Sequence, residues 1–242
     1  MGVKRTKIQL SIVVPCYNEG ENLPLLARRF ADAYAAKKGI ELVLVDNGSE
    51  DGSRAIMRAL VAKDKRIRIV SIKKNIGYGN GIWQGLRKAR GEYLCWTHAD
   101  LQTDIGDPLE AYLLAQAQNE PQRCFTKGQR KGRPLIDRIF TAGMSMFETL
   151  MLKGFLHDIN AQPNLFHRNL LKDIHDPPKD FSFDLYVYCM AKKKGYKVMR
   201  FPVLFVSRLH GQSSWNTGLG AKMRFMRRTI SYTFALKRRK DL

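Results

Sequence analysis

The sequence predicts an α/β fold in which helices flank a mixed, mostly parallel sheet. In the first half of the chain, short β-branched runs alternate with segments whose apolar residues recur at helical spacing. Polar or glycine-rich residues follow these runs, as they do in sheets built from strand–helix–strand crossovers. At 242 residues and 44% hydrophobic content, with no linker or internal repeat, the chain is expected to form one large domain.

Four strands and three helices are expected in the first half. The first strand, Leu10–Pro15, stops at a proline that cannot donate to a ladder. Asn22 followed by Pro24 marks the start of the first helix. The remaining elements alternate: strand Glu41–Val45, helix Arg54–Lys63, strand Ile67–Ile72, a helix that follows Asn75–Gly81 and runs to Ala89, and strand Tyr93–Trp96.

The second half is expected to be richer in helix. Its elements are helix Leu109–Ala117, strand Cys124–Gln129, a long amphipathic helix Ile136–Phe155, helix Ser182–Lys194, strand Lys197–Val206 and a closing helix Leu219–Arg239. Basic and apolar residues alternate along the closing helix, a pattern typical of helices that bind a membrane surface. An ordinary solvated helix packed on the domain is the alternative interpretation.

Composition limits the partners of the chain. Forty-two basic residues against 22 acidic ones give a net charge of +20, which indicates an anionic partner: nucleic acid, a phospholipid surface or nucleotide phosphates. The four cysteines are widely spaced and form no CxxC pair, so reduced thiols in a cytosolic protein are expected. No uninterrupted apolar window reaches about 18 residues, so no segment is expected to span a bilayer.

The polar residues after strand Tyr93–Trp96 are the strongest site candidates. His98, Asp100 and Gln102 are spaced by two, so in an extended chain they share one face. An imidazole, a carboxylate and an amide oxygen that converge can hold a divalent cation and leave positions open for phosphate oxygens. In the alternative interpretation these side chains merely sit in a loop after a strand.

Other polar residues are expected beside this cluster. Ligands of parallel sheets bind outside the carboxyl ends of the strands, which places Tyr17, Glu19, Asp46 and Asn75 along the same edge. The glycines between positions 77 and 85 follow the third strand, so they do not fit a dinucleotide fingerprint. Close helix packing and room for a ligand are expected of them instead.

Eight motifs occur in order along nearly the whole chain. They are Ser11–Glu19, Val43–Gly52, Asn75–Gly79, Ala99–Gln102, Lys127–Arg130, His157–Pro163, Phe183–Asp184 and Arg208–Trp215. With these motifs the chain resembles family 2 glycosyltransferases of the GT-A fold, and it is similar in layout to dolichol-phosphate mannose synthases and related bacterial enzymes. The resemblance implies one GT-A domain over residues 1–242, with a nucleotide-sugar half (1–106), an acceptor half (107–217) and a basic C-terminal helix (218–242).

The resemblance also implies a donor site. A nucleotide sugar is expected to contact Pro15, Tyr17, Glu19, Asp46, Asn75, Gly81, Asp100, Arg208, His210 and Trp215. Asp46 would accept a hydrogen bond from the base or ribose, and Asp100, with Gln102 and His98, would hold Mn²⁺ or Mg²⁺ at the donor phosphates. The family places acids where this chain has His98 and Asn47. The imidazole favours manganese over magnesium.

Inversion at the anomeric carbon is a further implication of the resemblance. Arg208 would stabilise the leaving group together with the cation, while His210 and Trp215 help to close a loop over the donor. A hydroxyl acceptor must lose a proton, for which Asp184 is the candidate base and Asp158 the reserve. A polyprenyl phosphate is already ionised, and three arginines stand where the dolichol-phosphate enzymes place acceptor-contacting basic residues: Arg130, Arg133 and Arg138.

The sequence therefore predicts a metal-dependent glycosyltransferase that moves a sugar from a UDP- or GDP-sugar to a polyprenyl phosphate, in the cytoplasm and peripheral at an anionic membrane surface. Transfer to a hydroxyl of a lipid-linked saccharide or a polysaccharide is an open alternative. The charge alone favours a nucleic-acid-binding protein, but the chain lacks a helix-turn-helix, zinc-finger or RNP signature, so nucleic acid is not an expected partner. A catalytically inactive family member, suggested by His98, is a third hypothesis.

Overall fold

A seven-stranded sheet forms the centre of the computed structural model, which describes residues 7–132, 135–152, 156–210 and 219–239. Its strands are β1 (Leu10–Cys16), β2 (Ile40–Asn47), β3 (Ile67–Ile72), β4 (Tyr93–Trp96), β5 (Cys124–Lys131), β6 (Asn164–His167) and β7 (Lys197–Leu204), in the order β3-β2-β1-β4-β6-β5-β7. β1 to β4 are parallel, β6 is antiparallel to β4 and β5, and β7 is parallel to β5. The predicted mixed, mostly parallel sheet is confirmed.

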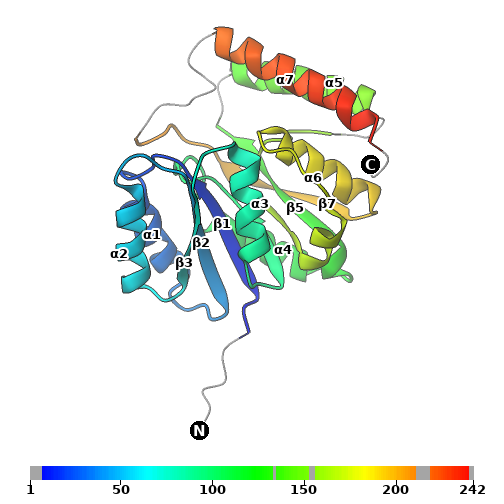
Figure 1. The fold of residues 1–242 in the computed structure, drawn as a ribbon. Coiled ribbons are helices and arrows are strands. Elements are labelled where there is room, and N and C mark those ends of the chain that lie inside the picture. The colour runs from blue at the N-terminus through cyan, green and yellow to red at the C-terminus, as the bar shows by residue number, and fades with distance from the viewer. Residues whose placement is uncertain (1–6, 133–134, 153–155, 211–218, 240–242) are drawn as a thin grey trace.

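Helices cover both faces of the sheet (Figure 1). They are α1 (Leu23–Ala33), α2 (Ser53–Lys63), α3 (Tyr78–Lys88), α4 (Asp107–Gln116), α5 (Leu135–Met151), α6 (Ser182–Lys193) and α7 (Leu219–Lys237), with 3₁₀ turns at Pro121–Arg123 and Arg168–Asp173. Side chains alternate across β1, so Leu10, Ile12 and Val14 share a core with α1 and α4, whereas Val13 shares one with α3 and α6. Apolar cores on both faces explain why this strand is almost entirely apolar, with Ser11 as its one hydroxyl residue.

Every strand and helix that the sequence predicts is present, with bounds that differ by a few residues. Ile67–Ile72 and Tyr93–Trp96 have the predicted bounds. One strand was not predicted, namely β6, which holds the antiparallel position between β4 and β5. Its four residues, Asn-Leu-Phe-His, contain two adjacent apolar side chains and no periodicity, so the sequence carries no signal for it.

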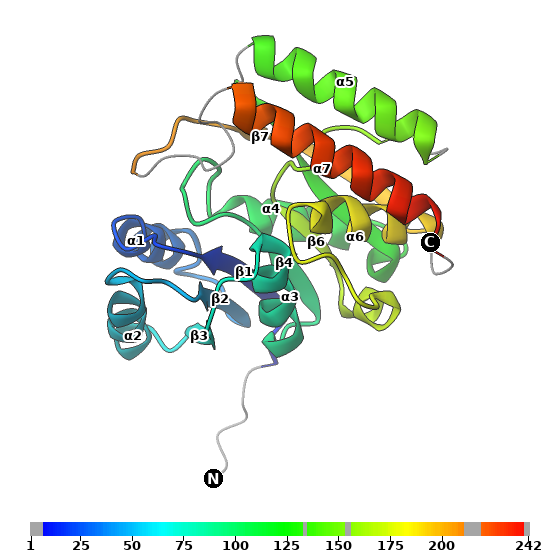
Figure 2. The same cartoon turned by 45° about the horizontal axis from the view of Figure 1, so that its top comes forward.

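Helices α5 and α7 lie side by side across the upper edge of the sheet (Figures 1 and 2). Their rings Phe147 and Phe234 make an edge contact with centroids 6.5 Å apart. Arg228 of α7 forms an ion pair with Asp180, just before α6, at 3.1 Å. Of the helices within the described ranges, none combines the length and the apolar character that crossing a membrane requires.

All four cysteines have free thiols, and three of them, Cys16, Cys95 and Cys124, are buried. Cys189 is partly buried. Burial raises the pKa of all four thiols. Their burial indicates packing roles.

Candidate active site

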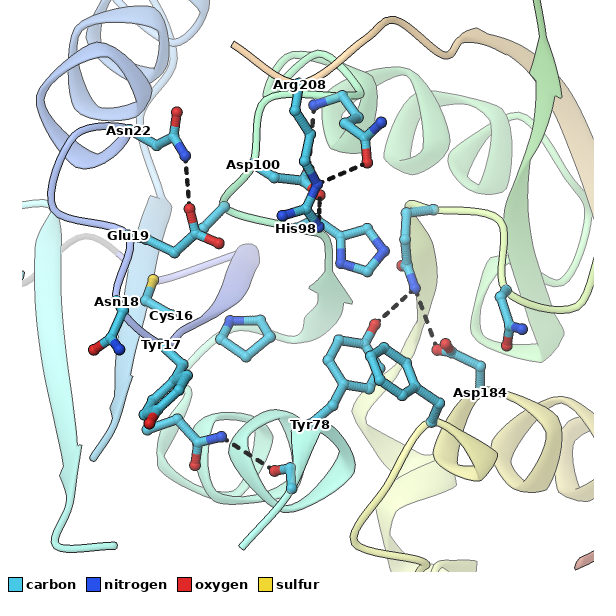
Figure 3. A pocket seen from close by; sticks show the side chains of 18 of the residues that line it. Cys16, Tyr17, Asn18, Glu19, Asn22, Tyr78, His98, Asp100, Asp184 and Arg208 are labelled. Carbon is cyan, nitrogen blue, oxygen red and sulfur yellow. Dashed lines mark hydrogen bonds and ion pairs between the residues drawn. The ribbon is translucent and has the colours of Figure 1, made fainter. Parts of the chain in front are cut away.

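A cavity of about 860 Å³ opens where β1, β2 and β4 end, and side chains of α5 and α7 line its far side. Figure 3 shows the loop after β1, with Tyr17 and Glu19, facing Asp100 and Arg208, and Tyr78 with Asp184 completing the ring. The carboxyl ends of the parallel strands thus supply much of the lining, as the rule for such sheets requires.

Most of the predicted site residues line this one cavity. They are Pro15, Tyr17, Glu19, Asn75, His98, Asp100, Gln102, Arg130, Asp184, Arg208 and His210. Asp46, Gly81 and the reserve base Asp158 do not line it. Arg133 and Trp215, and the side chain of Arg138, lie outside the described residues.

Asp46 serves the loop that follows β2 and does not face the cavity. Its Oδ1 accepts a hydrogen bond from the Ser49 amide at 2.9 Å, and its Oδ2 accepts one from Arg54 Nε at 2.6 Å. Burial alone raises the pKa of Asp46, but the hydrogen bonds from Ser49 and Arg54 outweigh burial and lower the pKa below its ordinary value. The expected direct contact with a base or ribose therefore has no support in the geometry, and the next residue, Asn47, lines the cavity instead.

The segment after β4 does not have the extended conformation for which a shared face of His98, Asp100 and Gln102 was expected. The chain bends from Ala99 onward, and Leu101 has a positive φ of 58°. Ala99 and Leu101 are nevertheless buried, as predicted, which leaves Asp100 and Gln102 at the cavity.

Arg208 bridges these two side chains (Figure 3). Its Nη2 lies 2.8 Å from Asp100 Oδ2, and its Nε donates to Gln102 Oε1 at 3.3 Å. A second hydrogen bond, from Gln102 Nε2 to the Val206 carbonyl at 3.1 Å, fixes the amide so that its oxygen faces the guanidinium. A carboxylate oxygen and an amide oxygen thus meet at one positive charge.

These oxygens suit a divalent cation of the Mg²⁺ or Mn²⁺ type, because hard cations bind carboxylate and amide oxygens. In the structure, the guanidinium of Arg208 is the positive charge that these two oxygens contact. A cation bound to the same oxygens would lie beside it. Among the described residues, no group of three or more His, Cys, Asp and Glu side chains is arranged to hold a metal. A cation here would therefore rely on a few protein ligands and on oxygens of its substrate.

His98 belongs to an aromatic stack on the other side of Asp100. Its ring stacks on Tyr78 at 5.6 Å between centroids, and Tyr78 stacks on Phe181 at 4.7 Å. His98 lines the cavity, so its imidazole is accessible to a ligand. Burial raises the pKa of Tyr78 well above its ordinary value, which keeps the phenol neutral.

Glu19 and Asp184 are acids at opposite sides of the cavity (Figure 3). Burial raises the pKa of both carboxyls. Glu19 Oε2 accepts a hydrogen bond from Asn22 Nδ2 at 2.6 Å. Asp184 lies in the first turn of α6 and is 2% exposed, and its Oδ1 accepts hydrogen bonds from Trp96 Nε1 at 2.9 Å and Gln162 Nε2 at 3.2 Å.

Arg130 and Asp158 form a buried ion pair. Arg130 donates to Asp158 from Nε at 2.9 Å, from its backbone amide at 3.0 Å and from Nη2. Although burial alone raises the pKa of Asp158, Arg130 lowers it below its ordinary value. Asp158 is thus a weaker base than Asp184, whose pKa is raised. The carboxylate of Asp158 also largely compensates the charge of Arg130.

Sequence reasoning did not assign several lining residues, including Tyr78, Gln162 and Glu148. Glu148 sits on α5, is 2% exposed, and makes no side-chain hydrogen bond or ion pair with the described residues. The signal that could have found it is an acid among apolar residues near the end of an amphipathic helix. Gln162 lies in the predicted motif His157–Pro163, but nothing in the spacing indicates which of its side chains face a cavity.

The model of the family described as "Glycosyl transferase family 2" matches residues 11–153. An undecaprenyl-phosphate 4-deoxy-4-formamido-L-arabinose transferase of Shewanella sediminis is 41% identical over 95 residues, which are 38% of this chain and 29% of that protein. A dolichol-phosphate mannosyltransferase of Mycosarcoma maydis is 31% identical over 149 residues, 56% of this chain and 49% of that protein. The matched segments thus span less than half of each relative.

Solved structures of similar shape cover almost the whole chain. Glucosyl-3-phosphoglycerate synthase from Mycobacterium tuberculosis, in complex with Mn²⁺, UDP and glucosyl-3-phosphoglycerate, superimposes with a TM-score of 0.69 at 15% identity, over 95% of this chain and 80% of that one. A mannosyltransferase from Pyrobaculum calidifontis, in complex with GDP-mannose and Mn²⁺, gives 0.68 at 20% identity, over 96% and 64%. These similarities confirm the predicted GT-A fold. Because the family model also matches more than half of the chain, this protein belongs to glycosyl transferase family 2.

Proposed function

We propose that this chain transfers a sugar, with inversion and with the help of a divalent cation, from a nucleotide-diphosphate sugar to a polyprenyl phosphate. The observation that carries the proposal is the meeting of Asp100, Gln102 and Arg208 in a cavity of about 860 Å³ at the carboxyl edge of the sheet. That volume suits a ligand of nucleotide-sugar size. The family membership and the nucleotide complexes of the two similar structures support the same reading.

The nucleoside end of the donor is assigned to the lining after β1 and β2. Tyr17 is 41% exposed beside the cavity, so its ring is available to a base. Asn47 donates to Asn75 Oδ1 at 3.2 Å and to the Gly77 carbonyl at 3.1 Å, which holds the loop after β3 against the end of β2. Glu19 supplies an acceptor for base or ribose hydroxyl groups. UDP and GDP both fit this description.

The diphosphate is assigned to Asp100, Gln102 and Arg208. Bound there, a cation supplies Lewis-acid stabilisation of the leaving diphosphate, with Asp100 and Gln102 as its protein ligands and His98 as a further candidate. Arg208 contributes a fixed positive charge to the same oxygens. His210, which lines the cavity and whose Nδ1 lies 3.8 Å from Glu21 Oε2, is assigned to the side of the donor that Arg208 contacts.

The names of two relatives support a polyprenyl phosphate acceptor. Arg130, Arg133 and Arg138 are proposed as its phosphate contacts. A hydroxyl of a lipid-linked saccharide is the second candidate, and the buried, cavity-lining carboxyl of Asp184 favours it, because a hydroxyl needs a base whereas an ionised phosphate does not. For either acceptor we propose that the chain works as one domain at an anionic membrane surface.

A matrix of donors and acceptors tests the proposal. Purified protein is assayed with UDP-, GDP-, dTDP- and CMP-sugars, with and without Mn²⁺, against undecaprenyl phosphate and against a lipid-linked saccharide that has free hydroxyls. We expect cation-dependent transfer from one donor class to the phosphate. Transfer only to the saccharide selects the second candidate, and absence of transfer from every donor class contradicts both.

Asp100→Asn tests the cation site, with Asp104→Asn as the matched control. Asp104 is exposed, lies on the same loop and does not line the cavity. We expect Asp100→Asn to lower transfer by about a hundredfold or more, because it removes the charged oxygen at the diphosphate, and Asp104→Asn to leave transfer close to that of the natural sequence. Unchanged transfer by Asp100→Asn excludes this cation assignment.

A further inference from the structure

The side chain of Lys127, on β5, is fully buried and lies outside the cavity. Its Nζ donates to the Ile159 carbonyl at 2.8 Å, to the Ala161 carbonyl at 3.1 Å and to Asn164 Oδ1. An ammonium has three donors and no acceptor, and here it meets three oxygens. The geometry therefore suits the protonated form, although burial lowers the pKa of Lys127 below its usual range.

A chain of hydrogen bonds leads from this ammonium to Asp184. Because Lys127 only donates, Asn164 must turn its Oδ1 toward Nζ, and its Nδ2 then donates to Gln162 Oε1 at 2.7 Å. Gln162 must in turn direct its Nε2 outward, where it donates to Asp184 Oδ1 at 3.2 Å and to the Tyr78 hydroxyl at 3.0 Å. Lys127 thus fixes the orientation of the Asn164 and Gln162 side-chain amides. As a result, Gln162 directs an N–H group at the carboxylate of Asp184.

The carboxylate of Asp184 needs this support. Burial raises its pKa, while Lys127, His98, Trp96 and Gln162 oppose the rise. Both of its observed hydrogen bonds, from Trp96 and Gln162, reach Oδ1, so they set the plane of the group. The remaining charged or titratable neighbours are Tyr78 on the cavity side, and Arg130, Asp158 and Arg200 around Lys127.

We propose that Lys127, Asn164 and Gln162 are positioning residues for Asp184. They keep its carboxyl group ionised and hold it by Oδ1, so that Oδ2 is the oxygen presented to the reacting sugar or to the hydroxyl that attacks it. The inference rests on the proposed function for the presence of that sugar. A merely structural role of Lys127 would stabilise the fold without setting the proton affinity of Asp184.

The indole of Trp96 gives a readout that does not require activity. Because Trp96 Nε1 donates to Asp184, the ¹⁵N–¹H resonance of that indole should follow the protonation of Asp184 as pH is varied. The assignment comes from comparing Trp96→Phe, and Asp184→Asn should remove the titration. The first variant is Lys127→Met, which removes the ammonium. The second is Gln162→Leu, which interrupts the hydrogen-bond chain but keeps Lys127, and it provides the test if Lys127→Met does not fold.

Arg168→Gln is the matched control. The guanidinium of Arg168 also donates hydrogen bonds to two backbone carbonyls, those of Gly91 at 2.7 Å and Ala89 at 2.7 Å. Arg168 is not part of the hydrogen-bond chain that leads from Lys127 to Asp184. We expect the titration midpoint to rise by one pH unit or more in Lys127→Met and Gln162→Leu, a tenfold or larger change in proton affinity, and to stay unchanged in Arg168→Gln. A midpoint that is unchanged in the folded variants, or that rises equally in the control, overturns the inference.

Kinetics separates this result from the fate of the proposed function. In the natural sequence we expect kcat for a hydroxyl acceptor to fall below the pH at which the indole titrates, and the variants to move that limb upward with little change in the donor KM. Lys127→Met should add no further loss in an Asp184→Asn background. If the indole titration shifts in the variants but no donor supports transfer, the proposed function is rejected and the hydrogen-bond chain from Lys127 to Asp184 is retained. If transfer occurs but the titration does not shift, only the role of that hydrogen-bond chain is rejected.

Discussion

Two buried aspartates near the carboxyl edge of the sheet differ in their partners. Asp46 is fully buried and meets Arg54 and the Ser49 amide, so its charge is compensated and its pKa is lowered despite burial. Asp184 has neutral donors only as its hydrogen-bond partners, Trp96 and Gln162, and burial raises its pKa. The contrast separates a carboxylate that shapes a loop from one that lines the cavity and for which we propose a role in the reaction.

Glu148 provides a pH-dependent test at the residue scale. Burial raises its pKa from the ordinary value of 4.5 to about 8. As pH rises, the unfolded chain loses this proton first, so the free energy of unfolding should fall between about pH 4.5 and about pH 8 and level off above. Glu148→Gln should remove that fall, with a gain on the order of 3 kcal/mol at pH 8.5 and little gain at pH 5.

Urea unfolding at the two pH values checks this prediction. Glu110→Gln is the control, because Glu110 is an exposed helical glutamate on α4. It should change the free energy of unfolding by no more than a few tenths of a kcal/mol at either pH. A Glu148→Gln gain that is equal at both pH values would show that this carboxyl is not protonated by burial.

The sequence predicted those site residues that follow directly from strand ends. Asp100 and Tyr17 come just after strands with strong apolar patterns, so the edge rule places them at the cavity without knowledge of the tertiary contacts. The chain from Lys127 to Asp184 could not be predicted, because it depends on the pairing of β5 with β6 and on the loop before β6. β6 itself has no periodic signal.

At the scale of elements, the contact of α3 with β1 and β2 depends on Gly85. A Cβ at this position would overlap side-chain atoms of Val13 and Val45, so only glycine lets the helix approach this closely. Sequence reasoning expected close helix packing from these glycines, and Gly85 confirms it. By contrast, a Cβ at Gly143 in α5 meets nothing within 4 Å.

The two mid-helix glycines therefore form a matched pair. Gly143→Ala should stabilise the protein by up to about 1 kcal/mol, because alanine has the higher helix propensity. Gly85→Ala should destabilise it by about 1–3 kcal/mol, because overpacking outweighs the same gain. Thermal or urea unfolding measures both, and equal effects of the two substitutions would contradict the close packing of α3.

The helix pair α5 and α7 shows how far amphipathic patterns carry. The sequence predicted both helices, because apolar residues recur at helical spacing through each segment. It did not indicate that Glu148 and Thr229 would line the cavity, since the pattern gives the apolar face of a helix but not the neighbour that covers it. One face of the helix pair therefore lines the cavity, whereas other side chains of the same helices are exposed at the surface.

At the scale of the molecule, the net charge of +20 and the exposed apolar side chains of α5 and α7 suggest the same partner. Met146, Leu150 and Met223 are 65%, 72% and 57% exposed, although large apolar side chains are usually covered. A basic protein with apolar side chains on one helix pair is suited to an anionic lipid surface, where a polyprenyl acceptor would reside.

Leu150→Glu tests this at one position, with Leu113→Glu as the matched control. Both leucines are exposed on helices, at 72% and 53%, and Leu113 lies on α4, whose core is on the opposite face of the sheet from that of α6. In sedimentation with phosphatidylglycerol vesicles, Leu150→Glu should weaken binding by roughly tenfold or more, because it replaces an inserted apolar side chain by a charge that the surface repels. Leu113→Glu adds the same charge and should weaken binding only slightly.

Raising the salt concentration should weaken vesicle binding by all three proteins, since electrostatic attraction is screened. Equal weakening by the two substitutions would mean that net charge alone, and not this helix pair, accounts for vesicle binding.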